Sequence, residues 1–524
     1  MKDYRALQNG SDIRGVALPG EAGKPVNLTK EAAADLTRAF ARFLAEKKGV
    51  KEAELSIAVG RDSRLSGQDL LRTVCTALSS IGVRAIDCGM ASTPAMYMST
   101  VFKEVDADGA IMITASHLPK FRNGFKYFTS DSGLDKNDIA WMIQKAEAMT
   151  LEPLPESDTL CETVDLMALY TAHLRQLISD KLGIPESDSP LAGLQVAVDA
   201  GNGAGGFFAT DILEPLGADI EGSQFLDPDG TFPNHSPNPE DAKAMQSISE
   251  AVRQSGADLG LLFDTDVDRS AAVDEHGNAI AGNGIIALAA ALLPPGDPGR
   301  IIVTDSVTSD LLTDFLQDEL GFTHLRYMRG YRNVIAKAMA LNAEGEDCPL
   351  AIETSGHAAY RDNYFLDDGA YLAALIVVEA ARRKKAGHGI RSLIDALKEP
   401  LESLEIRIPI RAEGASVYAD GVLKEVEALI ESGECTQEKP CEGRCRCGMK
   451  LVHPNYEGIR VSCDEENGDG WFLLRKSLHE PLLPLNIESN KAGGSALIAG
   501  KVADLLSVYA ALDLAVLKKE REQP

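Results

Sequence analysis

The chain is short of positive charge and has no long apolar run. Its 524 residues include 52 Lys and Arg against 79 Asp and Glu, a formal charge of −27, which argues against a general attraction to nucleic acid or an anionic membrane. No apolar run approaches the roughly eighteen residues that a membrane helix needs, and the opening MKDYRALQNGSDIRG lacks the apolar stretch of a signal peptide. We therefore expect a cytoplasmic protein with no nucleic-acid or membrane partner, whose anionic ligands meet a local basic cluster.

Cysteine, glycine and proline are also too sparse to define a special class. The 46 Gly and 24 Pro exclude a collagen-like or low-complexity chain. The nine Cys form no CxxC pair of the usual zinc modules, so reduced thiols in a reducing compartment are expected. Five of them lie between 435 and 463, where a thiol-rich surface insertion is preferred over a structural metal site.

Apolar stretches and helical patterns alternate along most of the chain. At roughly 100–200 residues per domain, the length predicts three or four domains. Strand-like LSIAVG, VRAIDCG and GAIMIT alternate with helical patterns, which is typical of α/β domains with a largely parallel sheet. The pattern starts three times, whereas the last part, with strands at IRIPI, KLVHP, GIRVSC and GWFLLR and a last helix, indicates a smaller α+β domain. The predicted domains are 1–155, 156–298, 299–400 and 401–524.

Three polar loops follow apolar strands, which is where ligands gather in open α/β sheets. After GAIMIT come Ser116 and His117, in a loop that Asn123 and Gly124 are expected to fold back before Lys126. Such a serine can act as a nucleophile with the lysine as proton carrier. An ordinary turn serine is the alternative.

The second loop, DTDVDR, carries Asp264, Asp266 and Asp268. Three carboxylates this close repel one another, and a hard divalent cation is the usual reason for retaining them, with Arg269 offsetting further charge. An EF-hand is rejected because Arg269 stands where glycine is needed. Two alternatives stay open: a solvated acidic turn, and an aspartyl nucleophile with its general acid two residues on, as in haloacid-dehalogenase-type phosphatases.

The third loop and a later basic cluster favour binding of a sugar and a phosphate. ETSGH places Glu353, Ser355 and His357 after a strand, where they suit hydroxyl recognition, although a helix-capping turn is an alternative. RKSLHEP offers Arg475, Ser477 and His479, donors suited to phosphate, against a solvated cationic turn. By contrast, GNGAGG at 201–206 matches a dinucleotide fingerprint but follows Asp199, whose charge would oppose a pyrophosphate, so a Rossmann cofactor is disfavoured.

Taken in order, these loops resemble those of the α-D-phosphohexomutase superfamily, the phosphomannomutases, phosphoglucomutases and phosphoglucosamine mutases. SDIRG, GRDSRLSG, TASHLPKFRNGFK, DTDVDR, ETSGH and RKSLHEP follow the family's order over nearly the whole chain. The resemblance implies three α/β domains with mixed sheets and a smaller C-terminal α+β domain around a central cleft. It also implies a hexose phosphate substrate and net movement of phosphate between O1 and O6.

The resemblance further implies a role for each matching residue. Ser116 would carry the phosphoryl group, passing through a hexose 1,6-bisphosphate, with glucose 1,6-bisphosphate or a similar compound as activator. One Mg²⁺ per chain would be held by Asp264, Asp266, Asp268 and the phosphoserine. Arg14 and Lys126 would stabilise charge and transfer the proton, and His117 would support the loop. The substrate would be bound by Arg269, Glu353, Ser355, His357, Arg475, Ser477 and His479.

Several residues depart from the family pattern. Thr265 replaces a glycine of the metal loop, so the turn is expected to differ slightly, and Ile352 replaces a glycine before the sugar loop. Leu478 and His479 stand where the family has small polar residues, which makes phosphate binding the least secure inference. Tyr331 stands where some relatives carry a proton-transferring histidine, so that role is not transferred.

A phosphomannomutase or phosphoglucomutase is the leading hypothesis. ETSGH lacks the Gln associated with the glucosamine enzymes, so a phosphoglucosamine mutase is an alternative of the same class. A catalytically silent phosphosugar-binding paralogue is an alternative of another class, favoured by the altered phosphate loop and disfavoured by intact Ser116 and Lys126. The sequence leaves monomer and homodimer equally open.

Overall fold

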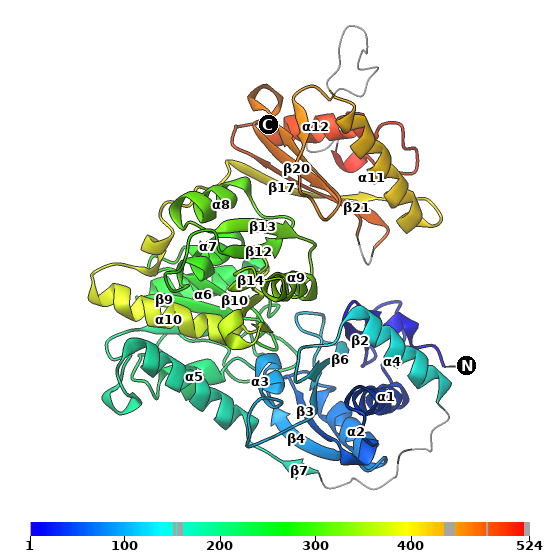
Figure 1. Ribbon diagram of the computed structural model, residues 1–524. Helices are drawn as coiled ribbons and strands as arrows, with labels where there is room; N and C mark the ends of the chain where they lie inside the picture. The colour runs from blue at the N-terminus through cyan, green and yellow to red at the C-terminus, as the bar shows by residue number, and fades with distance from the viewer. Residues whose placement is uncertain (1, 150–153, 155–160, 434–445, 478–479, 518–524) are drawn as a thin grey trace. The chain divides into compact units, whose positions relative to one another are not determined.

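The computed structural model describes residues 2–149, 154, 161–433, 446–477 and 480–517 (Figure 1). The chain forms two compact units, one of Met1–Asp297 with Ala338–Asp395 and the other of Pro298–Lys337 with Ala396–Pro524. Each unit encloses a hydrophobic core of its own. Over the described ranges, no helix is both long and apolar enough to span a membrane.

The first α/β segment is built on a mixed sheet with strand order β1-β2-β6-β5-β3-β4-β7. Its central strands β3, β4 and β5 are parallel, whereas β6 is antiparallel to both β5 and β2. The strands are β1 (Gln8–Asn9), β2 (Asp12–Val16), β3 (Ser56–Arg61), β4 (Arg84–Met90), β5 (Gly109–Ile113), β6 (Arg122–Thr129) and β7 (Glu162–Thr163). The helices are α1 (Lys30–Lys48), α2 (Gly67–Ser79), α3 (Thr93–Met98) and α4 (Lys136–Ala148).

Alternation along β3 explains how helices cover both faces of this sheet. Ile57 and Val59 belong to the core formed with α1, α2 and α4 and point to the same side, because successive strand side chains face opposite sides. On the other face, a Cβ on Gly60 would lie 2.4 Å from the sulfur of Met96 in α3. The small residue therefore lets α3 approach the sheet closely.

The second segment has a smaller mixed sheet of order β11-β10-β9-β8. β8 and β9 are parallel, and β10 runs antiparallel to β9. Its strands are β8 (Val196–Asp199), β9 (Leu259–Phe263), β10 (Ser270–Val273) and β11 (Ala279–Ile280). Its helices are α5 (Leu166–Leu182), α6 (Ala242–Ser255) and α7 (Asn283–Ala291), and the predicted helix at FFATDILEPLG is a short π-helix, η4 (Phe208–Leu213).

The third segment is shared between the two units. The second unit holds the parallel pair β12 (Ile301–Asp305) and β13 (Thr323–Tyr327), with α8 (Asp310–Asp314) and the π-helix η5 (Phe315–Glu319) between them. The first unit holds the antiparallel strands β14 (Leu350–Ile352), β15 (Ala358–Tyr360) and β16 (Leu366–Asp367), and α10 (Gly369–Lys385). The helix predicted after GYRNV, α9 (Tyr331–Ala343), begins inside that sequence. Three α/β segments with mixed sheets are thus confirmed.

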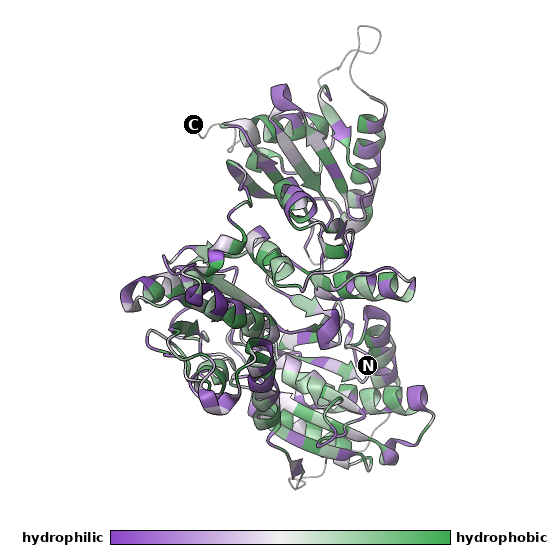
Figure 2. Cartoon of the chain, turned by 60° about the vertical axis from the view of Figure 1, so that its left-hand side comes forward, coloured by the Kyte–Doolittle hydropathy of each residue, from purple (hydrophilic) through white to green (hydrophobic). Residues whose placement is uncertain are grey.

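The C-terminal part forms an antiparallel sheet of order β17-β21-β20-β19-β18 with two helices, confirming the predicted α+β domain. Both hydrophobic and hydrophilic residues lie along the helices of the chain (Figure 2). In the first of the two helices of this domain the buried residues Ala419, Val422, Val426 and Ile430 recur every three or four positions, as expected where one face packs on a sheet. The strand β21 was not predicted, because Pro481 before it and Pro484 within it argue against a central strand. The elements are β17 (Glu402–Pro409), α11 (Ala415–Glu431), β18 (Met449–Leu451), β19 (Ile459–Cys463), β20 (Gly470–Leu474), β21 (Leu482–Ser489) and α12 (Gly494–Leu506).

Candidate active site

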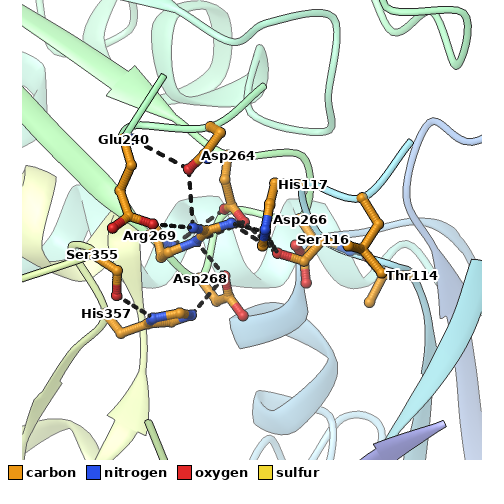
Figure 3. A network of polar contacts seen from close by, with 12 residues as sticks. Thr114, Ser116, His117, Glu240, Asp264, Asp266, Asp268, Arg269, Ser355 and His357 are labelled. Carbon is orange, nitrogen blue, oxygen red and sulfur yellow. Dashed lines mark hydrogen bonds and ion pairs between the residues drawn. The ribbon is translucent and has the colours of Figure 1, made fainter. Parts of the chain in front are cut away.

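Ser116 lies in the loop after β5 in a strained backbone conformation. Its φ is 49°, in the left-handed region that a serine rarely adopts, and its side chain is buried. The Oγ donates to Asp264 Oδ2 at 3.0 Å and accepts from Arg269 Nη2 at 2.9 Å. The loop thus aims the serine hydroxyl at the carboxylate loop of the second segment, although the two are 148 residues apart in the chain (Figure 3).

Arg64, from GRDSRLSG, holds the serine loop in this shape. Its guanidinium donates to the carbonyl oxygens of Ser116 and Leu118 and to those of Pro119 (3.0 Å) and Arg122 (2.9 Å). Asp62 accepts from the backbone N–H of Arg64 (2.9 Å) and from the hydroxyl of Thr114 (2.7 Å). In the sequence, GRDSRLSG serves only as a family signature, so the contacts of Arg64 with the serine loop were not predicted.

The loop between β9 and β10 brings three carboxylates together. Asp264, Asp266 and Asp268 are fully buried, and one oxygen of each lies within 4.8 Å of the others. Of the described side chains, Asp266 Oδ1 and Asp268 Oδ1 are buried without a hydrogen-bond partner, which suits an oxygen-loving divalent cation. The three residues could therefore hold a metal ion.

A different turn is expected at Thr265, but the unusual backbone conformation of this loop lies at another residue. The positive φ of this loop is at Val267 (65°), and Thr265 is not among the residues with positive φ. The carbonyl of Thr265 accepts from the backbone N–H of Ala204 at 2.8 Å. A Cβ on Gly203 would lie 2.7 Å from that same carbonyl oxygen, so the GNGAGG segment packs under the carboxylate loop.

Two cations offset the charge of the carboxylate loop. Lys126 donates from Nζ to Asp266 Oδ2 at 3.0 Å and also to Asp268 Oδ2. Arg269 donates to Asp264 Oδ2 from Nε (3.2 Å) and Nη2 (3.0 Å). Although burial opposes ionisation, Lys126 and His357 hold the pKa of Asp268 well below its usual range. For Asp264, burial and the neighbouring Asp268 raise the pKa.

Lys126 lies on a strand, which corrects one expectation. Asn123 and Gly124 are part of β6 and do not form a loop before Lys126. A Cβ on Gly124 would lie 1.9 Å from the carbonyl oxygen of Ile13, so the glycine serves close pairing with β2. Arg14 on β2 donates to the carbonyl of Thr114 at 3.2 Å and pairs with Asp12 at 2.7 Å, which places it beside the serine loop.

His117 contacts the serine and the guanidinium of Arg269. Its Nδ1 is 3.3 Å from Ser116 Oγ and 2.7 Å from Arg269 Nη2. Burial and the charges of Arg269 and Arg14 lower its pKa to about 3. The imidazole is therefore neutral near pH 7 and accepts the hydrogen bond from Arg269, which fits the predicted supporting role.

The sugar loop is the hairpin between β14 and β15, and it lies against the carboxylate loop. Gly356 has φ 92°, and a Cβ there would be 2.5 Å from the carbonyl oxygen of Ser270. Ser355 Oγ is 2.8 Å from His357 Nδ1, and Glu353 Oε2 is 3.5 Å from the same nitrogen. The structure thus brings all three predicted sugar-loop residues to the metal loop.

The predicted phosphate loop belongs to the second unit. Arg475 and Ser477 follow β20 and are half-buried, while His479 and Leu478 lie outside the described residues. Burial and the like charge of Arg329 lower the pKa of Arg475, and its Nε is buried without a hydrogen-bond partner in the described part of the chain. The carboxylates of Glu457, Glu405 and Asp305 also act on Arg475, and Arg329 pairs with Asp305 at 3.5 Å, so the unpartnered Nε of Arg475 is the group that suits an anion.

The described cysteines are free thiols, and they include Cys75, Cys88, Cys161, Cys348, Cys447 and Cys463. The remaining cysteines of the insertion, Cys435, Cys441 and Cys445, lie outside the described residues. The preference for a thiol-rich insertion over a structural metal site stays a prediction.

Comparisons with known proteins identify the family of the chain. Models described as phosphoglucomutase/phosphomannomutase alpha/beta/alpha domains I, II and III match residues 5–150, 168–277 and 281–400. The matches cover more than half of the chain, and the chain belongs to the phosphoglucomutase/phosphomannomutase family. The predicted superfamily is thereby confirmed. The prediction of a phosphotransferring isomerase is confirmed at the level of the family.

Individual relatives cover almost the whole chain. A phosphoglucomutase of Neisseria meningitidis is 29% identical over 490 residues, 93% of each chain. A phosphoglucosamine mutase of Corynebacterium jeikeium is 29% identical, over 92% of this chain and 96% of its own. The crystal structure of a phosphoglucomutase/phosphomannomutase family protein from Burkholderia thailandensis superposes with a TM-score of 0.74 at 25% identity, over 98% of this chain and all of that one.

Proposed function

We propose that the protein interconverts hexose 1-phosphates and hexose 6-phosphates, of mannose, glucose or both, through a phosphoserine at Ser116 and a hexose 1,6-bisphosphate. The observation that carries this proposal is the position of Ser116 Oγ, 3.0 Å from Asp264 and 2.9 Å from Arg269. A phosphoryl group on that oxygen would meet the guanidinium of Arg269 on one side and the carboxylate loop on the other.

Mg²⁺ fits the carboxylate loop. Asp264, Asp266 and Asp268 would hold the ion together with an oxygen of the phosphoserine, and two of their buried oxygens have no hydrogen-bond partner among the described residues. When bound, Mg²⁺ would neutralise charge on the transferring phosphoryl group. Lys126 contacts Asp266 and Asp268, so it already offsets part of this charge.

The reaction moves one phosphoryl group in each half. The bond between phosphorus and Ser116 Oγ breaks, a bond to O1 or O6 of the bound hexose phosphate forms, and the sugar hydroxyl loses its proton. We propose that Lys126 carries the proton: its ammonium gives a proton to the departing Ser116 Oγ, and the amine then takes the proton of the sugar hydroxyl. Arg14 and Arg269 stabilise the charge. The bisphosphate then turns over and returns its other phosphoryl group to Ser116, and glucose 1,6-bisphosphate would prime an unphosphorylated enzyme.

Substrate recognition divides between sugar and phosphate. Glu353, Ser355 and His357 are proposed to bind the sugar hydroxyls, because the hairpin holds all three beside the metal loop. Arg475 and Ser477, with His479, are proposed to bind the phosphate that does not react. The buried, unpaired Nε of Arg475 supports this assignment.

The contacts of the carboxylate loop weigh against the phosphatase alternative. An aspartyl nucleophile at Asp264 needs a free oxygen. Its Oδ2 accepts from Ser116 and from two nitrogens of Arg269, and its Oδ1 accepts from the backbone N–H of Arg269 at 3.3 Å. The general acid two residues on would be Asp266, whose Oδ2 accepts from Lys126 and Thr93. The carboxylate that should donate a proton is therefore an acceptor.

Phosphorus NMR tests the proposal. The protein with Mg²⁺ and a trace of glucose 1,6-bisphosphate is given mannose, glucose or glucosamine 1-phosphate in separate samples. We expect a 6-phosphate signal with mannose or glucose, absent in Ser116→Ala and present in a matched control, Ser132→Ala, whose serine lies in the turn after β6. Conversion of glucosamine alone would make the protein a phosphoglucosamine mutase. Free phosphate in the Ser116→Ala sample would favour the phosphatase, and no change with any sugar would favour a silent paralogue.

A further inference from the structure

Asp367, at the end of β16, is a buried carboxylate without a hydrogen-bond partner. Its side chain is 8% exposed, and neither oxygen has a partner in the described part of the chain. Its carboxylate forms an ion pair with His357 at 3.6 Å, but burying a carboxylate without hydrogen bonds is costly. The predicted site did not include Asp367, and the proposed reaction assigns it no role.

Asp367 points at the imidazole of His357, which also faces Asp268. His357 Nε2 is 3.6 Å from Asp367 Oδ2 and 3.6 Å from Asp268 Oδ1. These distances are too long for hydrogen bonds. They are close to the separation of two ligands of one tetrahedral zinc ion, which for metal–ligand bonds of about 2.1 Å is roughly 3.4 Å.

The Nδ1 nitrogen of His357 has a polar partner, as the second ring nitrogen of metal-binding histidines usually has. Ser355 Oγ lies 2.8 Å from His357 Nδ1, with Glu353 Oε2 at 3.5 Å. Such a partner fixes the ring and leaves Nε2 for a metal. Asp268 Oδ1, which faces Nε2, is likewise buried without a hydrogen-bond partner among the described side chains.

We propose that Asp268, His357 and Asp367 form a second metal site, selective for a late first-row divalent ion such as Zn²⁺ or Co²⁺. One oxygen of each carboxylate and His357 Nε2 lie within 4.8 Å of one another. Imidazole favours these ions over Mg²⁺, which prefers oxygen ligands alone. Asp268 belongs to both groups of residues that could hold a metal ion, so the two sites would share its carboxylate.

Occupation of this site would inhibit the enzyme. A metal ion on Nε2 takes the imidazole of His357 away from the sugar, and it places positive charge beside Lys126. This consequence rests on the proposed function, but metal binding itself does not. The site is therefore a candidate for inhibition by zinc that excess Mg²⁺ does not relieve.

Cobalt binding in the presence of saturating Mg²⁺ tests the proposal without an activity assay. We expect one equivalent of Co²⁺ with the strong visible absorption of a tetrahedral ion, and weakening of its affinity by at least about tenfold in Asp367→Asn and in His357→Asn. Glu240→Gln is the matched control, because Glu240 contacts Arg269 (3.8 Å) and its side chain is 47% exposed. Asp264→Asn, which disrupts the first site alone, should keep the tetrahedral signal.

Two results would overturn the second site. One is the absence of a tetrahedral signal from the wild-type protein, and the other is an unchanged affinity in Asp367→Asn with an unchanged melting temperature. If Co²⁺ binds as expected while no sugar is converted in the NMR experiment, the metal site stands and the mutase proposal fails. If mutase activity is present and zinc inhibits Asp367→Asn as strongly as wild type, the inhibitory role fails.

Discussion

The serine–carboxylate region of the first unit and the Arg475 region of the second unit are built in different ways. Asp264, Asp266 and Lys126 are buried in a network of opposite charges, so their geometry is fixed before any ligand arrives. Arg475 is half-buried, lies near the like charge of Arg329 and has an unpaired Nε. The first region suits charge development during a reaction, and the second suits capture of an anion.

Asp266→Asn should produce the largest effect of the variants that test this comparison. It removes charge from the metal loop and weakens the contact with Lys126 at 3.0 Å, so we expect kcat to fall by more than about a hundredfold. Steady-state kinetics over a range of Mg²⁺ concentrations measures this. Asp180→Asn, at an exposed position on α5, is the control. Full activity in Asp266→Asn would refute the metal assignment.

Arg64→Lys should have the second-largest effect, because a lysine cannot donate to several carbonyl oxygens in a fixed fork. The serine loop would lose its support, and we expect a fall in kcat of about ten- to a hundredfold with little change in KM. Arg72→Lys, on the exposed face of α2, should behave as wild type. A loss confined to KM would mean that Arg64 positions the substrate and not the serine.

Arg475→Lys should weaken substrate binding and leave the rate of the chemical step nearly unchanged. The single charge remains but the bidentate fork is lost, so KM for hexose 1-phosphate should rise by about tenfold while kcat stays within about twofold. Arg411→Lys, whose side chain is 74% exposed in the same unit, is the control. A large fall in kcat with unchanged KM would place Arg475 among the catalytic groups. It would refute the proposed difference between the two regions.

The smallest effect is expected beneath the metal loop, at His235. Its Nε2 lies 3.0 Å from Asp199 Oδ2, and although burial opposes it, the bond to Asp199 raises the pKa of His235. A raised folded-state pKa adds stability below the unfolded value of about 6.5, and this is lost as pH rises through the folded value. The melting temperature of wild type should therefore exceed that of His235→Gln by a few degrees at about pH 6, and the gap should narrow toward about pH 9. A gap that widens with pH would contradict the ion pair.

The sequence predicted the architecture because strand alternation and helix periodicity are local signals. It predicted Ser116, Lys126 and the three aspartates because their loops follow strands in a known order. It did not predict the support that joins these loops, since Arg64 acts through carbonyl oxygens of a loop more than fifty residues away and Gly203 through a close approach to Thr265.

Other misses have similarly physical causes. β21 was missed because Pro484 within it and Pro481 just before it contradict the pattern of a central strand. Asp367 was missed because its significance depends on a histidine ten residues earlier, and the pairing of β16 with β15 is what brings the two side chains within 3.6 Å. Neither feature leaves a local periodic signal.

The most direct test of the central claim is to ask which residue carries the phosphoryl group. The protein is incubated with glucose 1,6-bisphosphate and Mg²⁺, its intact mass is measured, and the modified peptide is sequenced by mass spectrometry before and after addition of hexose 1-phosphate. We predict one phosphoryl group on Ser116 that hexose 1-phosphate removes, with a hexose bisphosphate appearing in solution. A phosphoryl group on Asp264, or conversion of substrate with Ser116 never modified, would contradict the account.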